Sequence, residues 1–204
     1  MNTPMSTIIA LLRQTLGFTS ESVSTSIMEA NVAAQMRNHG LKDPADYLAL
    51  LRTAPDALTQ LIDMTVVPET WFFRDNEPFR FVREWIRRNG LHADHQPAVR
   101  ALSIPCSTGE EPYSLAMTLR LAGVALNRIQ IDAMDISRRA LEHARCGLYG
   151  KHSFRERNSE EYQAFFTQDG PVWSVNNSIM GTVSFRHGNV LDFCHQAQDS
   201  GTYQ

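Results

Sequence analysis

The stretch "ALSIPCSTGEEPYSLAM", residues 101–117, constrains the fold more than any other part of this 204-residue chain. An apolar strand pattern leads into a tight turn, and a helical pattern over 110–122 follows directly. The strand pattern "IQIDAMD" comes next, and a second helical pattern follows it. Strands that alternate with helices in this order are typical of a parallel sheet. The sequence therefore predicts an α/β fold with a parallel sheet.

The turn between the first strand and its helix differs from loops that bind phosphate. Dinucleotide-binding loops carry several glycines, and P-loops add a lysine. This turn has one glycine, no lysine, and two acids, Glu110 and Glu111. Such a turn would repel a phosphate and favour a ligand with positive charge. A structural alternative stays open, because two overlapping capping boxes also fit, Ser107–Glu110 and Thr108–Glu111.

Asp135 ends the second predicted strand. Ligands of open α/β sheets bind beyond the carboxyl ends of the strands, where an acid can accept hydrogen bonds from two ribose hydroxyls. A helix cap with Ser137 nearby is the alternative. Together the acids favour a nucleoside with a cationic tail and no phosphate, which describes S-adenosylmethionine. Arg74 offers a cation for the carboxylate of such a ligand, or else is a surface charge, and the adjacent "WFF" is mainly expected in the core.

Helical patterns fill residues 1–65, and they favour a small helical domain. Asp43 is expected to cap one helix with Pro44 at its first position, and Pro55 is expected to open the next. Asp75 is expected to cap a further helix over 77–89. Later in the chain, "PVWSV" and "TVSF" are expected to pair as an antiparallel ribbon, and "VSFRHGNVLDF" is expected to form a further strand with its exit loop.

Composition excludes several classes of function. The net charge of −3 argues against a nucleic-acid surface, which is expected to be basic. Three widely spaced cysteines without a CxxC pair predict reduced thiols and no metal site. The N-terminus lacks signal-peptide features, and no apolar run reaches the roughly 18 residues of a membrane span. We therefore expect a cytoplasmic protein without membrane insertion.

Three motifs carry a resemblance to a known family: "ETWFFRDNEPF", "CSTGEEPYSLAM" and "AMDISRRALEHARCGLY". Together they resemble the chemotaxis-receptor methyltransferases, the CheR family. The resemblance implies an N-terminal helical domain (1–75), a connecting helix and linker (76–97), and a Rossmann-like S-adenosylmethionine-dependent methyltransferase domain (98–204). It also implies a small antiparallel β-subdomain at about 170–186.

The motif matches place six residues at the cofactor, S-adenosyl-L-methionine: Thr70, Arg74, Glu111, Asp135, Asn189 and Val190. Arg74 matches the residue on the methionine carboxylate and is the one candidate catalytic residue, although it is not expected to transfer protons. Glu111 matches the acid near the methionine end, and Asp135 matches the ribose-binding acid. Thr70 matches a further cofactor contact. Asn189 matches the residue near the adenine, with Val190 beside it.

The implied activity is methyl transfer to glutamate side chains of a chemoreceptor-like signalling protein, giving glutamyl methyl esters and S-adenosyl-L-homocysteine. This reaction depends on positioning, because the sulfonium already activates the methyl group and an ionised carboxylate needs no base. Two alternatives stay open. In the first, the chain is a non-catalytic module that binds the cofactor or a receptor. In the second, it is a methyltransferase that acts on another acidic substrate.

Departures from the family pattern modify these expectations. Pro105, in "SIPCSTGEEP", has no backbone N–H, so a cofactor contact there is expected to use its carbonyl. The segment "SIMEANVAAQMRNHG", arginine-rich in chemotaxis members, keeps only Arg37, which favours a specialised partner. The segment "TQDGPVWSVNNSIMGTVSF" looks short for a β-subdomain that grips a receptor tail peptide, so methylation is expected to be independent of such a tail. The chain also stops soon after "VLDF", so we expect a fragment that is inactive by itself.

Overall fold

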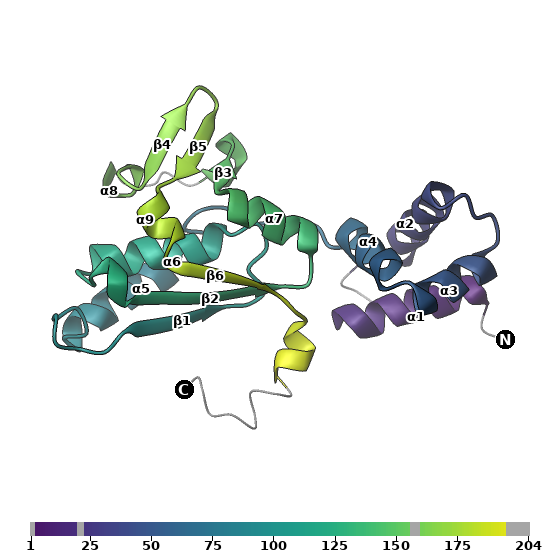
Figure 1. Ribbon diagram of the computed structural model, residues 1–204, viewed down its shortest axis with the longest axis horizontal. Coiled ribbons are helices and arrows are strands. Elements are labelled where there is room, and N and C mark those ends of the chain that lie inside the picture. The colour runs from purple at the N-terminus through teal and green to yellow at the C-terminus, as the bar shows by residue number, and fades with distance from the viewer. Residues whose placement is uncertain (1–2, 20–22, 156–159, 195–204) are drawn as a thin grey trace. The chain divides into compact units, whose positions relative to one another are not determined.

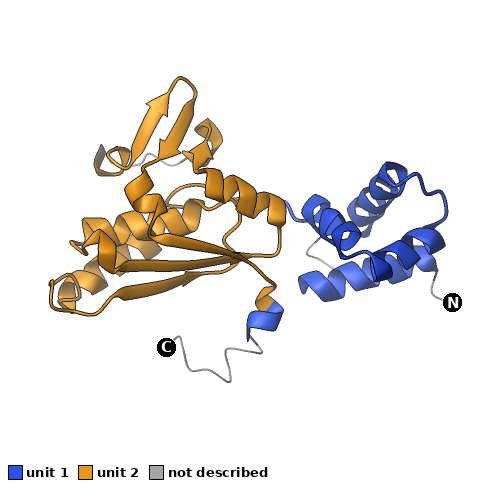
Figure 2. Cartoon of the chain, in the orientation of Figure 1, with its two compact units in different colours: residues 1–67, 191–204 blue, residues 68–190 orange. Residues whose placement is uncertain are grey.

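The computed structural model describes residues 3–19, 23–155 and 160–194 (Figure 1). These residues divide into two compact units, coloured separately in Figure 2. Described residues up to Val67 and from Leu191 onward belong to unit 1, and Pro68–Val190 form unit 2. None of the described helices is both long and apolar enough to cross a membrane.

Unit 1 is helical, with α1 (Pro4–Leu16), α2 (Thr25–Asn38), α3 (Pro44–Thr53) and α4 (Pro55–Thr65). The first of these packs on α3, and α2 packs on α4. The predicted helix starts are confirmed. The Asp43 side chain accepts a hydrogen bond from the backbone N–H of Ala45 at 2.8 Å, with Pro44 at the first helical position. Pro55 likewise opens α4, because its fixed φ suits a first helical turn.

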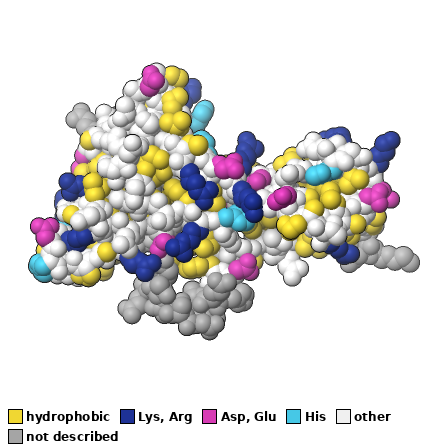
Figure 3. All heavy atoms as spheres, in the orientation of Figure 1, with side chains coloured by type: hydrophobic (Ala, Val, Ile, Leu, Met, Phe, Trp, Pro, Cys, Tyr) yellow, Lys and Arg dark blue, Asp and Glu magenta, His cyan; other side chains and the backbone are white. Residues whose placement is uncertain are grey.

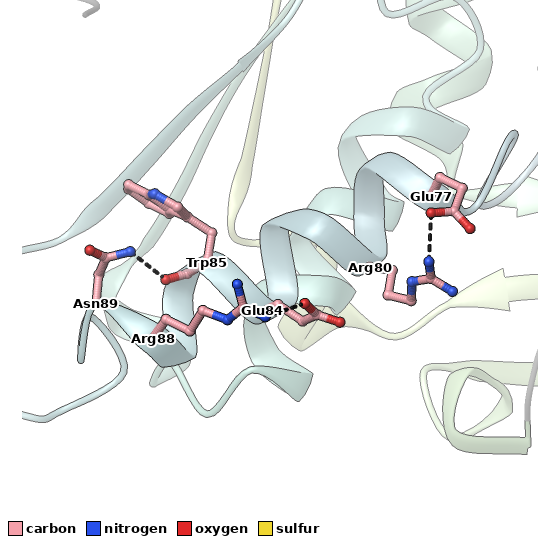
Figure 4. Close-up of polar contacts among 6 residues, drawn as sticks. All are labelled: Glu77, Arg80, Glu84, Trp85, Arg88 and Asn89. Carbon is pink, nitrogen blue, oxygen red and sulfur yellow. Dashed lines mark hydrogen bonds and ion pairs between the residues drawn. The ribbon is translucent and has the colours of Figure 1, made fainter.

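Helix α5 (Glu77–Arg88) belongs to unit 2, where it packs against α6 (Glu110–Leu121). Its inward face buries Phe79 and Ile86. Its outward face carries two ion pairs, Arg80 with Glu77 at 2.7 Å and Arg88 with Glu84 at 3.1 Å (Figure 4).

The expected N-cap of α5 is wrong. The structure places Asn76 at the cap, and no side chain caps this end. Asp75 instead adopts the left-handed conformation with φ 59°, whereas an N-cap residue is typically extended, so the chain is still turning at Asp75.

The central sheet of unit 2 contains β1 (Val99–Ser103), β2 (Ile129–Asp135) and β6 (Val183–His187). All three strands are parallel, in the order β1-β2-β6. The short helix η1 (Leu126–Arg128) precedes β2, and α7 (Arg138–Cys146) follows it. Helix α6 packs on β1 and β2, whereas α7 packs on β2 and β6. The predicted α/β fold with a parallel sheet is confirmed.

The two faces of the central sheet differ in chemistry because side chains alternate along each strand. Ile131 and Ala133 of β2 are buried. Between them, Asp132 points to the opposite face and pairs with Arg100 at 3.0 Å and with Arg186 at 3.6 Å. Among the described residues, this second face therefore carries a row of charges across all three strands.

A second, antiparallel sheet in the order β3-β5-β4 contains β3 (Leu148–Tyr149), β4 (Phe166–Asp169) and β5 (Val172–Val175). Three short helices flank it: η2 (Lys151–Ser153), α8 (Glu160–Gln163) and α9 (Asn177–Met180).

The expected pairing of "PVWSV" with "TVSF" is wrong. Strand β5 pairs with β3 and β4, whereas "TVSF" opens β6 and joins β2 in the central sheet. Two features explain this result. Gly170, with φ 56°, and Pro171 close a tight hairpin between β4 and β5. Val183 and Phe185 pack against the core cluster beneath α6 instead of the small sheet.

An aromatic cluster fills the space between the 68–76 loop and the small sheet. Phe72 is fully buried and contacts three rings, with centroid distances of 4.8 Å to Tyr149, 5.1 Å to Phe154 and 4.8 Å to Phe166. Phe73, at 1% exposure, stacks on Tyr162 at 3.7 Å. The expectation that this part of "WFF" packs in the core is confirmed for both phenylalanines.

Candidate cofactor site

The carboxyl ends of the three central strands lie at one edge of the sheet, at Ser103, Asp135 and His187. The loops that follow these strands are joined by backbone hydrogen bonds. The N–H of Cys106 donates to the carbonyl of Met134 at 2.9 Å, and the N–H of Gly188 donates to the carbonyl of Asp135 at 3.0 Å. This edge is where a parallel α/β sheet places its ligand.

Asp135 is held by backbone donors on both sides. One carboxylate oxygen accepts from the N–H of Ser107 and the other from the N–H of Ser137, each at 2.8 Å. The N-cap of α7 is Ser137, so Asp135 is not the cap residue itself. A carboxylate has about four acceptor sites, so Asp135 keeps capacity for two more hydrogen bonds. The side chain is therefore fixed in place and still able to accept from a pair of hydroxyls.

The turn that precedes α6 is built around Gly109. This residue is the N-cap, with φ 96°, and no side chain caps the helix. Both expected capping boxes are therefore wrong, because the left-handed Gly109, and neither Ser107 nor Thr108, occupies the cap position. A Cβ added at Gly109 would lie 2.8 Å from the Cβ of Ala144. Glycine thus lets the turn pack directly on α7.

Glu110 is a buried carboxylate that joins two distant segments. At 2% exposure, it accepts from the hydroxyl of Thr108 at 2.6 Å and from the hydroxyl of Ser153 at 2.8 Å. The sequence pattern predicts a helix-capping acid at Glu110 and does not indicate this role. No local signal identifies it, because Ser153 is 43 residues further along the chain.

Glu111, one residue further along α6, is exposed. It accepts a hydrogen bond from the hydroxyl of Ser103 at 2.7 Å, which directs its carboxylate toward the end of β1. Its exposed oxygens can still receive a cationic ligand group, because one carboxylate accepts several hydrogen bonds.

The 68–76 loop is tied to the same region. The N–H of Phe72 donates to the carbonyl of Ser153 at 2.8 Å, and the N–H of Phe73 donates to the hydroxyl of Ser114 at 3.0 Å. Ser114 in turn donates to the carbonyl of Glu110 at 2.7 Å. The structure thereby fixes the loop that carries Thr70 and Arg74 to the first turn of α6.

Arg74 lies at the surface of this loop, with its side chain 48% exposed. Its guanidinium donates to the carbonyl of Glu69 at 2.8 Å and lies over the ring of Trp71 at 4.7 Å from the centroid. The remaining donors can bind a planar carboxylate, for which the guanidinium fork is well suited.

Asn189 and Val190, both half-buried, come directly after Gly188, whose N–H is bonded to the Asp135 carbonyl. His187 strengthens this junction, because its Nε2 lies 2.9 Å from the carbonyl oxygen of Ile136. The chain that leaves β6 is therefore held beside the end of β2, next to Asp135.

Cys106, in the same turn, has an unreactive thiol. Burial, together with the nearby Asp135 carboxylate, raises the pKa of its thiol from 9.0 to about 12. The thiol stays protonated at neutral pH and so is not a nucleophile here.

The donor set at this edge fits S-adenosylmethionine. Asp135 can accept from ribose hydroxyls, Arg74 can bind the carboxylate of the methionine moiety, and Glu111 can pair with its ammonium group. The two acids, Glu110 and Glu111, disfavour a phosphate at the start of α6. Asp135 and Glu111 already accept internal hydrogen bonds, but each carboxylate keeps its charge and further acceptor sites for the cofactor.

Comparison with known families gives the decisive match. Residues 68–200 match the family described as "CheR methyltransferase, SAM binding domain", and residues 5–64 match "CheR methyltransferase, all-alpha domain". The chain belongs to the CheR methyltransferase family. The expected resemblance is thus confirmed, and S-adenosylmethionine is confirmed as the cofactor of the matched domain.

Similar proteins carry names that agree with this family. A probable biofilm formation methyltransferase, WspC, of Pseudomonas aeruginosa is 36% identical over 89% of this chain and 43% of its own length. A chemotaxis protein methyltransferase of Escherichia coli is 30% identical over 90% of this chain and 65% of its own length. The WspC of Pseudomonas putida is 35% identical and is likewise covered over 43% of its length. The chain thus spans less than half the length of both WspC relatives.

Proposed function

We propose that this chain is the cofactor-binding part of an enzyme that transfers methyl groups from S-adenosylmethionine to glutamate side chains of a chemoreceptor-like signalling protein. The products are glutamyl methyl esters and S-adenosylhomocysteine. The observation that carries the proposal is the fixed Asp135 carboxylate at the meeting point of the strand ends, inside a domain that matches the family over residues 68–200.

Methyl transfer requires the protein mainly to position the cofactor and the acceptor glutamate. When bound, S-adenosylmethionine supplies a methyl group that its sulfonium activates, so a glutamate carboxylate takes it without a base and leaves a neutral thioether. In the proposed arrangement, Asp135 holds the ribose, Arg74 the methionine carboxylate and Glu111 the ammonium group. Thr70, Asn189 and Val190 complete the proposed contacts. Arg74 orients the cofactor and transfers no proton, because an arginine stays protonated at all relevant pH values.

The partner is proposed to be a specialised receptor in the cytoplasm. The names of the relatives connect such enzymes with chemotaxis and with biofilm formation. Helix α2 has one arginine, Arg37, and one acid, Glu29, so it offers no strongly basic surface to an acidic receptor helix. Because α2 carries one basic and one acidic residue, we propose that the receptor helix is less acidic than usual or that it docks on unit 2.

A transfer assay tests the proposal. Labelled S-adenosylmethionine is incubated with the complete protein and with cytoplasmic fragments of candidate receptors, and the label is then challenged with mild base. We expect base-labile label on receptor glutamates, located by mass spectrometry. Cofactor binding without transfer to any candidate would favour the non-catalytic module, whereas base-stable label would indicate a different acceptor group.

A further inference from the structure

Two guanidinium groups contact the indole ring of Trp71. Arg74 lies 4.7 Å from the ring centroid and Arg155 lies 5.0 Å from it. Each contact is favourable as a cation–π interaction, but together they bring two like charges to one ring. Arg74 makes a long ion-pair contact of 3.9 Å with Asp75, and in the described parts of the chain Arg155 has no acidic partner. Two guanidinium groups held at one ring favour an anion beside them, and a planar carboxylate suits their donors.

The position of Arg155 is fixed by its neighbours. Ser153 accepts from the backbone N–H of Phe72 and donates its hydroxyl to buried Glu110. Phe154 stacks on Phe72 with centroids 5.1 Å apart, and it also contacts Trp173 of β5 at 5.0 Å. The residue that follows Phe154 is therefore held beside Trp71 by packing on both sides, although its own side chain is exposed.

The proposed reaction brings two carboxylates to the methionine end of the cofactor. One belongs to the methionine moiety of the cofactor and the other to the acceptor glutamate. Two guanidinium groups lie beside Trp71, Arg74 from the same loop and Arg155 from the segment after η2. Since Arg74 is assigned to the cofactor carboxylate, the second guanidinium stays available for the acceptor.

We propose that Arg155 binds the carboxylate of the methyl-accepting glutamate, with Trp71 as the platform that holds its guanidinium flat. This inference rests on the proposed function and adds a substrate-positioning residue to it. Arg155 holds one carboxylate oxygen and leaves the other free to attack the methyl carbon. Methylation removes the negative charge that Arg155 binds. Arg155 therefore strengthens binding of the acceptor glutamate more than it accelerates the chemical step.

Fluorescence of Trp71 provides a direct test. The chain has three tryptophans, so Trp85→Phe and Trp173→Phe leave Trp71 as the sole reporter. The probe is a synthetic alanine-rich helical peptide with two glutamates on one face, and its control carries glutamines at the same positions. Both are titrated into the full chain saturated with S-adenosylhomocysteine. We expect the glutamate peptide to change the Trp71 emission saturably and the glutamine peptide to leave it unchanged.

Variants then separate Arg155 from its surroundings. Arg155→Ala should weaken the glutamate peptide about tenfold or more, as expected for a lost hydrogen bond between charged groups, with unchanged S-adenosylhomocysteine affinity. Arg155→Lys should recover part of that loss, since it keeps the charge without the fork. Arg74→Ala should instead weaken S-adenosylhomocysteine. Arg88→Ala is the matched control, because Arg88 is exposed at the far end of α5 and pairs with Glu84 (Figure 4).

Three results would overturn the inference. They are equal peptide binding by Arg155→Ala and the unchanged protein, equal behaviour of the two peptides including no binding by either, and a loss of S-adenosylhomocysteine affinity in Arg155→Ala. The last result would assign Arg155 to the cofactor. Failure of the proposed function is visible separately, as absence of S-adenosylhomocysteine binding before any peptide is added.

Discussion

Asp135 accepts a backbone N–H with each carboxylate oxygen, so its orientation is set by the fold and not by a ligand. The donors come from the turn before α6 and from the start of α7. A ribose that bound here would therefore meet an acceptor already in place, which lowers the ordering cost of binding.

Replacing Asp135 tests the ribose assignment. Asp135→Asn keeps the shape but loses the charge and half of the acceptor capacity, so we expect S-adenosylhomocysteine affinity to fall by about 1–3 kcal/mol. Calorimetry measures the affinity, and circular dichroism reports the fold. Ser137→Ala is the control: it removes the hydroxyl that caps α7 and should cost about 1 kcal/mol of stability with little change in affinity. A folded Asp135→Asn with unchanged affinity would contradict the ribose role.

The start of α6 depends on a glycine for two separate reasons. Gly109 has φ 96°, a conformation that costs other residues about 1–2 kcal/mol. An added Cβ would also meet Ala144 at 2.8 Å and the hydroxyl of Tyr149 at 2.9 Å. Tyr149 donates to the carbonyl of Thr108 at 2.8 Å, so displacing it would disturb the turn itself.

We expect Gly109→Ala to lower the melting temperature and to weaken S-adenosylhomocysteine, because both strain and a steric clash act on the cofactor turn. Gly123→Ala is a matched comparison: its φ is 103°, but the nearest contact of an added Cβ is His92 at 3.4 Å. Thermal unfolding followed by circular dichroism measures both variants. A loss at Gly109 no larger than the loss at Gly123 would show that the tight contact with α7 does not matter.

The small sheet gives a prediction about docking. Its β4–β5 hairpin is closed by Gly170 and Pro171 and lacks a glycine-rich tip. We expect methylation of a receptor fragment to proceed at nearly the same rate after its C-terminal tail is removed. Initial rates with intact and tail-deleted acceptor provide the measurement, and a large loss on deletion would mean that the small sheet does bind a tail peptide.

Helix α2 shows the limit of periodicity at the scale of one element. Among its apolar residues, Ile27 is 53% exposed, whereas the adjacent Met28 is fully buried. The helix itself forms where the helical pattern over residues 1–65 predicts one, because periodicity is a local signal, and Ser24 caps its start. Which of two neighbouring apolar residues turns inward is decided by packing against α4, and no local signal contains that information.

At the scale of the whole chain, charge is balanced. Acidic and basic side chains are interspersed on the face that Figure 3 shows, and the net charge is −3. Exposed ion pairs such as those of α5 contribute little stability. The fold is therefore expected to depend mainly on its buried aromatic and aliphatic side chains.

Burial of neutral acids predicts a loss of stability in alkali. Burial raises the pKa of the Cys106 thiol from 9.0 to about 12 and that of the Tyr47 phenol from 10.0 to about 12. The unfolded chain releases these protons at lower pH than the folded chain. Their contribution to stability is therefore complete below about pH 9 and is lost as the pH rises toward about 12. Urea midpoints across this range measure the effect, and a flat or rising midpoint would contradict it.

Local chemistry was enough to predict much of this protein. Asp43 and Pro44 marked a helix start, "IQIDAMD" marked a strand, and Asp135 was placed at a strand end, because each signal lies within a few neighbouring residues. The same local signals failed at the turn before α6. There a left-handed glycine, packed against α7, displaced both capping boxes.

Contacts between distant segments were decided by the tertiary structure. The hydroxyl of Ser153 on Glu110, the guanidinium of Arg155 on Trp71 and the pairing of β6 with β2 each join residues that are far apart in the chain. Burial of apolar surface brings such segments together, and it depends on the summed packing of all elements and not on any one of them. Sequence patterns therefore predict where the strands end, whereas tertiary packing determines which side chains come into contact at those ends.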